Sequence, residues 1–346
     1  MKNKEVSMDR IKEYLSSKLW LSVVIAIIVL CVVFSILSPA FLQWSNFQAV
    51  LVQSSITGIM AVGLCFVIMT GGIDISIGAI LLLSATVFAY TVNGTESFML
   101  AFLASLSTAT LAGVLNGVLV YYFKMAPMIT TLATYNIYNG IALHISKTEN
   151  VPIDRGYTFL GNGRIANIPV PLMILLAITL IGAYLLSHTR FGTFVRAVGD
   201  SQVSATESNL PTRRTIVSAY TLAGFTAGLA GVLLISRTAG LQNSLGVGTE
   251  FTCIAAVVLG GTALSGGSGS VVGSVFGAVF LILIDNGLNL LQASPFIYDA
   301  VRGIVLLAAV SVDRMSTARQ AKTLLEQKAL RIGSSIIKQV KKTAQA

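Results

Sequence analysis

Long apolar runs alternate with short polar segments along almost the whole chain. Seven runs hold no Asp, Glu, Lys or Arg and cover residues 19–37, 47–69, 75–92, 98–123, 126–145, 168–186 and 216–236. Weaker or interrupted runs follow at 251–264, 269–284 and 296–312. An apolar helix of about 20 residues crosses a hydrocarbon core, and lipid offers backbone groups no other partners. The pattern predicts an all-α polytopic membrane protein of about ten transmembrane helices.

Composition excludes a soluble protein. Hydrophobic residues make up 54% of the 346 residues and charged residues only 11%, whereas soluble domains carry about 25% charged residues. The mean hydropathy is +0.81. A soluble fold of this composition would expose large apolar patches.

Two glycine-rich breaks interrupt the apolar pattern. Residues 69–79 read MTGGIDISIGA, and residues 257–273 read VVLGGTALSGGSGSVVG. Glycines allow close backbone approach and positive φ, which we expect at Gly71 and Gly72. Asp74 is expected to cap the following helix, with Ser76 in its first turn. One interrupted segment in each part of the chain is typical of transporters with two related halves.

Basic residues predict the orientation and the domain boundaries. Eighteen of the 23 Lys and Arg residues fall in the head (1–18), at Lys124, in the loop 188–214 and in the tail (313–346). With an even number of spans these segments share one side, which the positive-inside rule assigns to the cytoplasm. We expect a membrane domain over 19–312, cytoplasmic termini and a basic amphipathic tail on the inner leaflet. The net charge of +9 then reports topology and not nucleic-acid binding.

Few polar residues lie within the apolar runs, and such residues usually face a bundle interior or water. The candidates for a pathway or a special turn are Gly71, Gly72, Asp74, Ser76, Asn136, Asn139, Glu250 and Asn286. Asp74 is open to two interpretations, a structural cap or a pathway residue. For Asp285 and Arg302 a structural role is favoured.

Small residues recur at the spacing that lets helices approach closely. One stripe holds Gly269, Gly273 and Gly277, another holds Gly224 and Gly228, and a third holds Gly113 and Gly117. The spacing leaves open whether these stripes pack within one subunit or between subunits.

Catalytic and metal-binding patterns are absent from the sequence. There is no nucleophile elbow, no zinc-protease motif and no phosphate-binding loop. The three cysteines lie in apolar runs, and the two histidines have no partners at ligand spacing. We therefore expect no enzyme activity, no metal and no cofactor, and ATP would have to bind to a separate subunit.

Five segments resemble the membrane permeases of sugar-type ABC importers, the family of the ribose, xylose, galactoside and autoinducer-2 systems. They are GGIDISIGA (71–79), TRFGTFVRAVGD (189–200), AGLAGVLL (227–234), AAVVLGGTALSGGSGSVVGSVFGA (255–278) and DNGLNLL (285–291). The similarity runs from the first span to Asp313.

The resemblance implies a coupling helix over residues 200–210 that docks on an ATPase subunit. The residues that it assigns to coupling are Arg196, Asp200, Ser204, Ala205, Glu207 and Asn209. The family pattern there usually has a paired alanine and a glycine, in place of which this chain has Ser204-Ala205-Thr206 and Asn209.

The implied partners are an ATP-binding subunit, a periplasmic or lipid-anchored sugar-binding protein and a second permease subunit in the cytoplasmic (inner) membrane. The implied cargo is a neutral sugar, with ribose or a similar monosaccharide first. Two alternatives stay open. One is an ABC permease for a nucleoside or a branched-chain amino acid, and the other is an ion-coupled secondary carrier.

Overall fold

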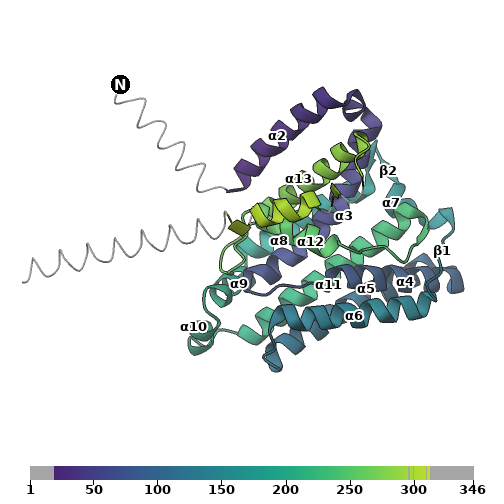
Figure 1. Ribbon diagram of the computed structural model, residues 1–346. Helices are drawn as coiled ribbons and strands as arrows, with labels where there is room; N and C mark the ends of the chain where they lie inside the picture. The colour runs from purple at the N-terminus through teal and green to yellow at the C-terminus, as the bar shows by residue number, and fades with distance from the viewer. Residues whose placement is uncertain (1–18, 295–296, 299, 309, 312–346) are drawn as a thin grey trace, which may run out of the picture.

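The computed structural model describes residues 19–294, 297–298, 300–308 and 310–311, and it is a bundle of long helices that run side by side (Figure 1). Within this part of the chain six helices are long and apolar enough to cross a membrane. They are α3 (Trp44–Met69), α4 (Ile77–Thr95), α5 (Phe98–Tyr122), α8 (Val170–His188), α11 (Thr212–Thr238) and α13 (Val271–Leu290). Helices α2 (Leu19–Leu37) and α6 (Pro127–Ser146) flank the bundle.

Short elements gather at the two ends of the bundle (Figure 1). The α10 end carries α9 (Arg190–Asp200) and α10 (Gln202–Glu207). The α7 end carries η2 (Arg155–Tyr157), α7 (Phe159–Asn162) and two antiparallel pairs of strands. These pairs join β1 (Val151–Pro152) to β4 (Gly240–Leu241) and β2 (Arg164–Ile165) to β3 (Ile168–Pro169), and η1 (Pro39–Leu42) links α2 to α3.

Local sequence signals explain where the helices begin. Ser97, Thr189 and Ser270 each accept a hydrogen bond from the backbone N–H three residues later, and so cap α5, α9 and α13. Proline stands in the first turn of α6 and α8, where its missing N–H costs nothing.

The core forms around α3, α4 and α11, whose apolar windows are mostly buried, whereas only 28% of the apolar window is buried in α5 and in α8. Small residues allow the closest approaches. A Cβ built on Gly113 would lie 3.0 Å from the Gly224 Cα, and one on Gly63 would lie 2.9 Å from the Ala223 Cα. The stripe glycines Gly269, Gly273 and Gly277 face α3, α12 and the loop after it. All three predicted stripes therefore contact neighbouring helices of the same chain.

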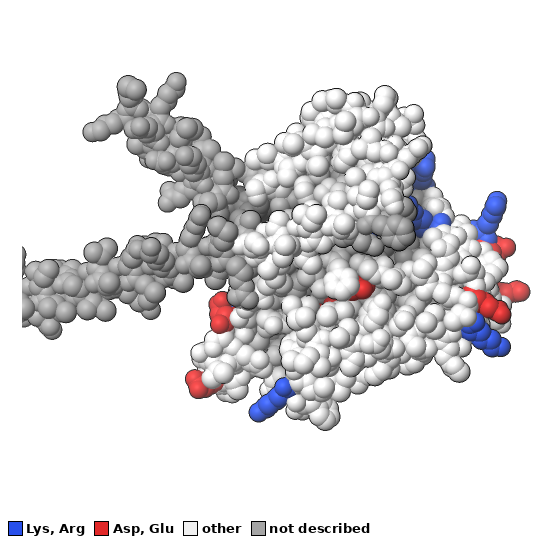
Figure 2. All heavy atoms as spheres, in the orientation of Figure 1, with Lys and Arg blue, Asp and Glu red and all other residues white. Residues whose placement is uncertain are grey.

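Charged side chains on the visible face gather at the two ends of the bundle, and the belt between them is almost uncharged (Figure 2). Large hydrophobic side chains are exposed along the helices, among them Leu111, Leu180 and Ile181. A soluble domain would not leave such a belt in water, so the chain is a multi-pass membrane protein.

One expected span differs in the structure. In place of a run over 251–264 there is α12 (Thr249–Leu259), which has 11 residues and is about 16 Å long. It is too short to cross a bilayer, because residues 260–270 leave the helix and α13 begins only at Val271. The predicted head 1–18 and tail 313–346 lie outside the described residues.

Candidate functional site

Both glycine-rich breaks end their helices with the same backbone motif. At the end of α3, Gly71 has φ +81°, its N–H donates to Ile68 O, and Gly72 N–H donates to Val67 O. At the end of α12, Gly261 has φ +90°, its N–H donates to Val258 O, and Thr262 N–H donates to Val257 O. This is the Schellman arrangement, which closes a helix and turns the chain away. Positive φ occurs at Gly71, whereas Gly72 shows the other expected feature, a close approach, since a Cβ there would lie 2.7 Å from Tyr220 Oη.

Asp74 anchors a buried polar network behind the first break. Its Oδ1 accepts from Ser76 N–H at 2.9 Å and from Ser76 Oγ–H at 2.6 Å. Asn116 on α5 donates to Ser76 Oγ at 2.7 Å, and Tyr138 on α6 donates to Asn116 Oδ1 at 3.1 Å. Asp74, Ser76 and Asn116 are fully buried. The network therefore ties the break to two other helices.

The capping prediction for Asp74 needs a correction. Helix α4 begins at Ile77 and Ser76 is its N-cap, whose side chain caps no N–H of the helix. Asp74 thus binds the residue two positions on, as in an Asx turn, and Ser76 lies before the first turn and not within it. Thr131 on α6 fixes the strand-like residues between them, since its Oγ1 accepts from Ile75 N–H and donates to Ile73 O, each at 3.1 Å.

Three polar atoms beside this break are buried without a hydrogen-bond partner among the described residues: Asp74 Oδ2, Tyr220 Oη and Glu250 Oε2. Tyr220 belongs to α11, and its hydroxyl would lie 2.7 Å from a Cβ on Gly72. Unsatisfied buried polar atoms are rare in folded proteins, and polar groups at membrane depth usually mark a pathway. Their clustering makes the break the candidate functional site.

Two helix N-termini meet at the same place. A Cβ on Gly78, in the first turn of α4, would clash with Glu250 Oε2 and with Gly246 O, and would lie 3.2 Å from Thr249 Oγ1. Residues Thr249 and Glu250 open α12. Helix N-termini carry partial positive charge, so the buried Glu250 carboxylate offsets the charge of both ends. Glu250 thus lies against the break, a position that the sequence did not predict for it.

The two breaks touch each other and the end of α9. Gly267 N–H donates to Met69 O at 2.9 Å. A Cβ on Gly266 would lie 2.9 Å from both Gly71 N and Gly199 O. A Cβ on Gly199, next to the last residue of α9, would clash with Met69 O and Gly267 N. Backbones at this distance move together because interiors are closely packed.

Other predicted pathway residues lie away from the break. Asn136 is exposed and donates to Leu132 O within its own helix, and Asn139 is half-buried on the same helix. Asn286 exchanges hydrogen bonds with Asn46 at 2.7 and 3.0 Å, which fastens α13 to α3. Asp285 and Arg302 form an ion pair at 2.6 Å, as a structural role requires.

The predicted coupling residues lie on two short helices at the α10 end. Arg196 and Asp200 belong to α9 and Ser204, Ala205 and Glu207 to α10, which Asn209 follows. The expected helix over 200–210 is shorter, because Ser201 caps it and Glu207 ends it. Ser204, Glu207 and Asn209 are exposed, but Ala205 is buried against its own chain, with 4% of its surface accessible.

Sequence reasoning missed three features. Val203 on α10 is 68% exposed, and an exposed branched apolar residue in a polar helix was the available signal. Gly199 and its contact with both breaks gave no local signal. The hydrogen bonds that link Ser76 to Asn116 on α5, and Asn116 to Tyr138 on α6, gave none, because they join residues far apart in the sequence.

No cluster of His, Cys, Asp and Glu that could hold a metal ion occurs among the described residues. The buried cysteines Cys65 and Cys253 lie in the apolar core. The polar atoms at the break are hydroxyl, amide and carboxylate groups, which can bind a polar solute by hydrogen bonds.

Comparison with known proteins identifies the family. Residues 46–310 match the family model described as branched-chain amino acid transport system / permease component. The chain is 40% identical over 299 residues to the ribose import permease protein RbsC of Bacillus subtilis (strain 168), covering 85% of this chain and 92% of the relative.

Two further relatives come from Escherichia coli (strain K12). The ribose import permease protein RbsC is 36% identical over 86% of this chain and 95% of its own length. The D-allose transport system permease protein AlsC is 35% identical over 84% of this chain and 90% of its own length. No solved structure matches the chain. The family match and the relatives agree, so the chain belongs to this family of permease components and is a membrane transport subunit, not an enzyme.

Proposed function

We propose that this chain is the permease subunit of an ATP-driven ABC importer that moves a neutral sugar, ribose or a similar monosaccharide, across the cytoplasmic membrane. The names of its relatives support a sugar most directly, since they are permeases for ribose, allose and L-arabinose with identities of 33–40%. Their similarity covers both breaks and the α9–α10 segment.

The chemistry of the break suits a polyol. Ser76, Asn116, Tyr138 and Tyr220 surround it with hydroxyl, amide and aromatic groups, which bind an uncharged sugar by hydrogen bonds and stacking. Asp74, Ser76 and Tyr220 are fully buried here, so this conformation is closed at the break. In this proposal Gly71, Gly72, Asp74, Ser76 and Glu250 line or shape the pathway, and Asn136, Asn139 and Asn286 are weaker candidates.

A rigid contact between α9 and both breaks supports ATP-driven operation. An ATPase subunit docked on α10 would push on Gly199, and through Gly199 on Met69 and Gly267. Motion of a docked helix can thus reach the pathway as a rigid-body shift. Val203 is the apolar contact expected for such docking, and Arg196, Asp200, Ser204, Glu207 and Asn209 form its polar surroundings.

The proposed topology places the α10 end and both termini in the cytoplasm. The membrane domain covers residues 19–312, and the loop 188–214 within it is the coupling segment. The domain includes about ten transmembrane segments, of which α12 is too short to cross the bilayer as a helix by itself, in two related halves. The matching motifs at the ends of α3 and α12 support the relation between the halves. The basic tail 313–346 lies on the inner leaflet. Two permease subunits, identical or paralogous, form the channel, and a solute-binding protein delivers the sugar to the α7 end.

A branched-chain amino acid is the second candidate cargo, because the family model carries that description. The decisive experiment purifies the cognate binding protein and measures its thermal stability with a panel of pentoses, hexoses, nucleosides and branched-chain amino acids. The true ligand raises stability by mass action. A shift with a sugar supports the proposal, and a shift with leucine or a nucleoside alone overturns the sugar assignment.

The energy source needs a separate test. Uptake in cells should fail when ATP is depleted and should persist when the proton gradient is collapsed with ATP maintained. The reverse result would identify an ion-coupled carrier.

A further inference from the structure

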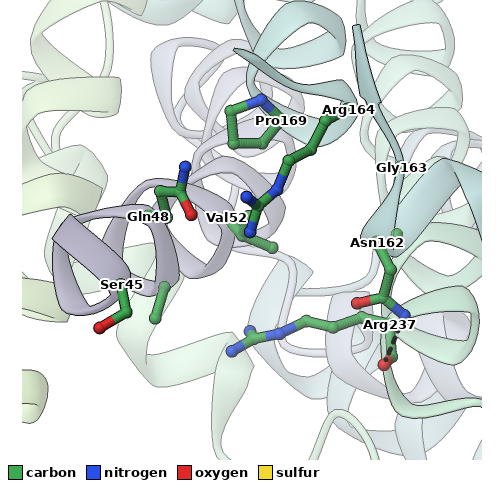
Figure 3. Close-up of a pocket in the computed structure, with 10 residues that line it drawn as sticks. Ser45, Gln48, Val52, Asn162, Gly163, Arg164, Pro169 and Arg237 are labelled. Carbon is green, nitrogen blue, oxygen red and sulfur yellow. Dashed lines mark hydrogen bonds between the residues drawn. The ribbon is translucent and has the colours of Figure 1, made fainter. Parts of the chain in front are cut away.

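A polar cavity of about 210 Å³ opens at the α7 end, between the start of α3, the α7 turn and the β2–β3 hairpin (Figure 3). Arg164 and Arg237 reach into it from one side, and Ser45 and Gln48 of α3 face them from the other (Figure 3). No acidic side chain lines the cavity. Two positive charges are therefore gathered without a counter-charge in the wall.

Asn162 of the cavity wall donates to Ser236 O and Arg237 O, whereas the side chains of Arg164, Arg237 and Gln48 have no hydrogen-bond partner among the residues that the structure describes. Neither guanidinium group has an acidic partner among the described residues. The ion pair found among these residues joins two others, Arg302 and Asp285. Gln48 is 94% buried, with 6% of its surface accessible, and its amide makes no hydrogen bond within the described chain. The amide atoms of Gln48 are not sealed off from the cavity, so they are free to exchange hydrogen bonds with a ligand there.

The backbone adds a third source of positive potential. Helix α3 has 26 residues, and no side chain caps its N-terminus. Its first N–H groups and its dipole favour an anion near Ser45 and Gln48. The planar guanidinium group of an arginine can donate two parallel hydrogen bonds to two oxygens of a phosphate, and a helix N-terminus adds positive potential beside it.

Exposed apolar residues flank the cavity residues in the sequence. Trp44 and Phe47 stack at 5.6 Å between ring centroids and are 64% and 49% exposed. Ile165 and Ile168 of the hairpin are 50% and 45% exposed. Aromatic and basic residues together are typical of the interface between headgroups and acyl chains.

We propose that this cavity binds the phosphate of a phospholipid headgroup, with Arg164 and Arg237 on the phosphate oxygens and Gln48 as a further donor. A cavity of about 210 Å³ has room for a phosphodiester group. The acyl chains then lie along the exposed apolar residues. Basic pockets between membrane helices bind lipid headgroups on the cytoplasmic side of membranes, and the same chemistry is proposed here at the α7 end, which the proposed topology places outside.

The test compares lipid retention in the purified full-length protein by native mass spectrometry. The variants are Arg164→Gln, on the exposed hairpin, and Arg237→Gln, with Arg155→Gln as a control that removes an exposed arginine at the same end outside the cavity. We expect wild type and control to retain phosphatidylglycerol equally and each cavity variant to retain at least fivefold less. Equal retention in all four proteins would overturn the proposal.

A second measurement separates the sources of the anion. Thermal stability is recorded in nanodiscs of phosphatidylcholine with and without phosphatidylglycerol, and in detergent with inorganic phosphate. Stabilisation by the anionic lipid that both variants lose supports the lipid site. Stabilisation by inorganic phosphate without any lipid effect would make the cavity a general anion site and overturn the proposal.

Folding and function are controlled separately. Arg237→Lys keeps the charge, so a correctly folded Arg237→Lys protein that retains lipid shows that a loss in Arg237→Gln is not due to misfolding. If the cavity variants keep their lipid but fail to capture the cognate binding protein, the cavity receives a protein carboxylate and the lipid assignment is wrong. The readouts do not depend on which solute is transported.

Discussion

At the scale of single residues, the site depends on atoms that have too little room or too few partners. Gly72 lies against Tyr220 Oη, and that hydroxyl has no hydrogen-bond partner among the described residues. Asp74 has room but lacks hydrogen-bond partners on one side. Its Oδ1 accepts two hydrogen bonds and its Oδ2 accepts none from the described residues. These two residues give separable tests of packing and of polarity.

Gly72→Ala should destabilise the protein and reduce uptake, because its Cβ would come 2.7 Å from Tyr220 Oη. Overpacking of this kind costs about 1–3 kcal/mol. Tyr220→Phe removes the hydroxyl and should leave stability unchanged or raise it by up to about 1 kcal/mol.

The double variant Gly72→Ala with Tyr220→Phe should recover part of the loss. The measurement is thermal unfolding in detergent of the four proteins of a double-mutant cycle: the wild type, the two single variants and the double variant. Additive effects would show that the two residues are not in contact.

Asp74→Ala should cost about 1–3 kcal/mol, because it leaves the N–H and hydroxyl of Ser76 without their acceptor. Asp74→Asn keeps an acceptor oxygen and should fold nearly as well as the wild type. Unfolding and uptake are measured for both. Normal stability with lost uptake in Asp74→Asn would assign the carboxylate to the pathway, whereas normal uptake would make it a structural anchor.

At the scale of elements, the short helix α9 at the α10 end and two broken membrane helices meet through glycines. Gly267 and Gly248 have the same φ of +79°, but their surroundings differ. A Cβ on Gly267 would clash with Asp200 Oδ1, while one on Gly248 would meet nothing within 4 Å. Comparing substitutions at these two glycines therefore separates the effect of the contact with Asp200 from the effect of backbone strain.

Gly267→Ala should therefore lose more stability and uptake than Gly248→Ala. In both variants the left-handed conformation of the new alanine costs about 1–2 kcal/mol of stability. In Gly267→Ala the new methyl group also pushes the second break away from the end of α9. Uptake and thermal stability are measured side by side. Equal losses would show that strain, and not the contact with α9, is what matters.

Val203→Asp should weaken binding of the ATPase subunit, because it places a charge on the exposed apolar residue of α10. Ser208→Asp adds the same charge at an exposed neighbouring position and should bind normally. Co-purification with the ATPase subunit and substrate-stimulated hydrolysis are the readouts. If Val203→Asp behaves like Ser208→Asp, α10 is not the docking helix.

Ala205→Arg is a poorer probe of the same contact. The methyl group of Ala205 is buried in its own chain, so arginine there would disturb α10 itself. A loss of coupling in that variant would not distinguish docking from local misfolding.

At the scale of the whole molecule, a belt with almost no charged side chains separates two charged ends (Figure 2). The α10 end and the α7 end must lie on opposite sides of a membrane if the long helices cross it. The side to which each end belongs follows from the distribution of basic residues.

Single cysteines at Asn150 and Ser208, both exposed, should react from opposite sides. Cys31, Cys65 and Cys253 are first replaced by serine or alanine. An impermeant thiol reagent should label Asn150→Cys in intact cells and Ser208→Cys only after lysis. Labelling of both in intact cells would refute the topology, and labelling of Ser208→Cys alone would invert it.

The sequence alone determined the class of protein and most of its helices. Runs such as 47–69 and 98–123 correspond closely to α3 and α5, because a bilayer demands uninterrupted apolar helices whatever their neighbours are. The two breaks were also readable, since glycine pairs end a helix through local backbone geometry. Where the pattern weakened, as at 251–264, the extent of α12 could not be read, because burial in protein replaces the requirement for a full span.

Only the tertiary structure decided what these segments do to each other. It placed the two breaks against Gly199, linked Ser76 to Asn116 on α5 and Asn116 to Tyr138 on α6, and paired Asn286 with Asn46 across 240 residues. It also buried Ala205, exposed Val203 and gathered Arg164 and Arg237 at one cavity. Hydropathy and local motifs fix how a helix begins, ends and meets lipid. The contacts between helices depend on close packing of side chains that are distant in the sequence, and no local pattern records them.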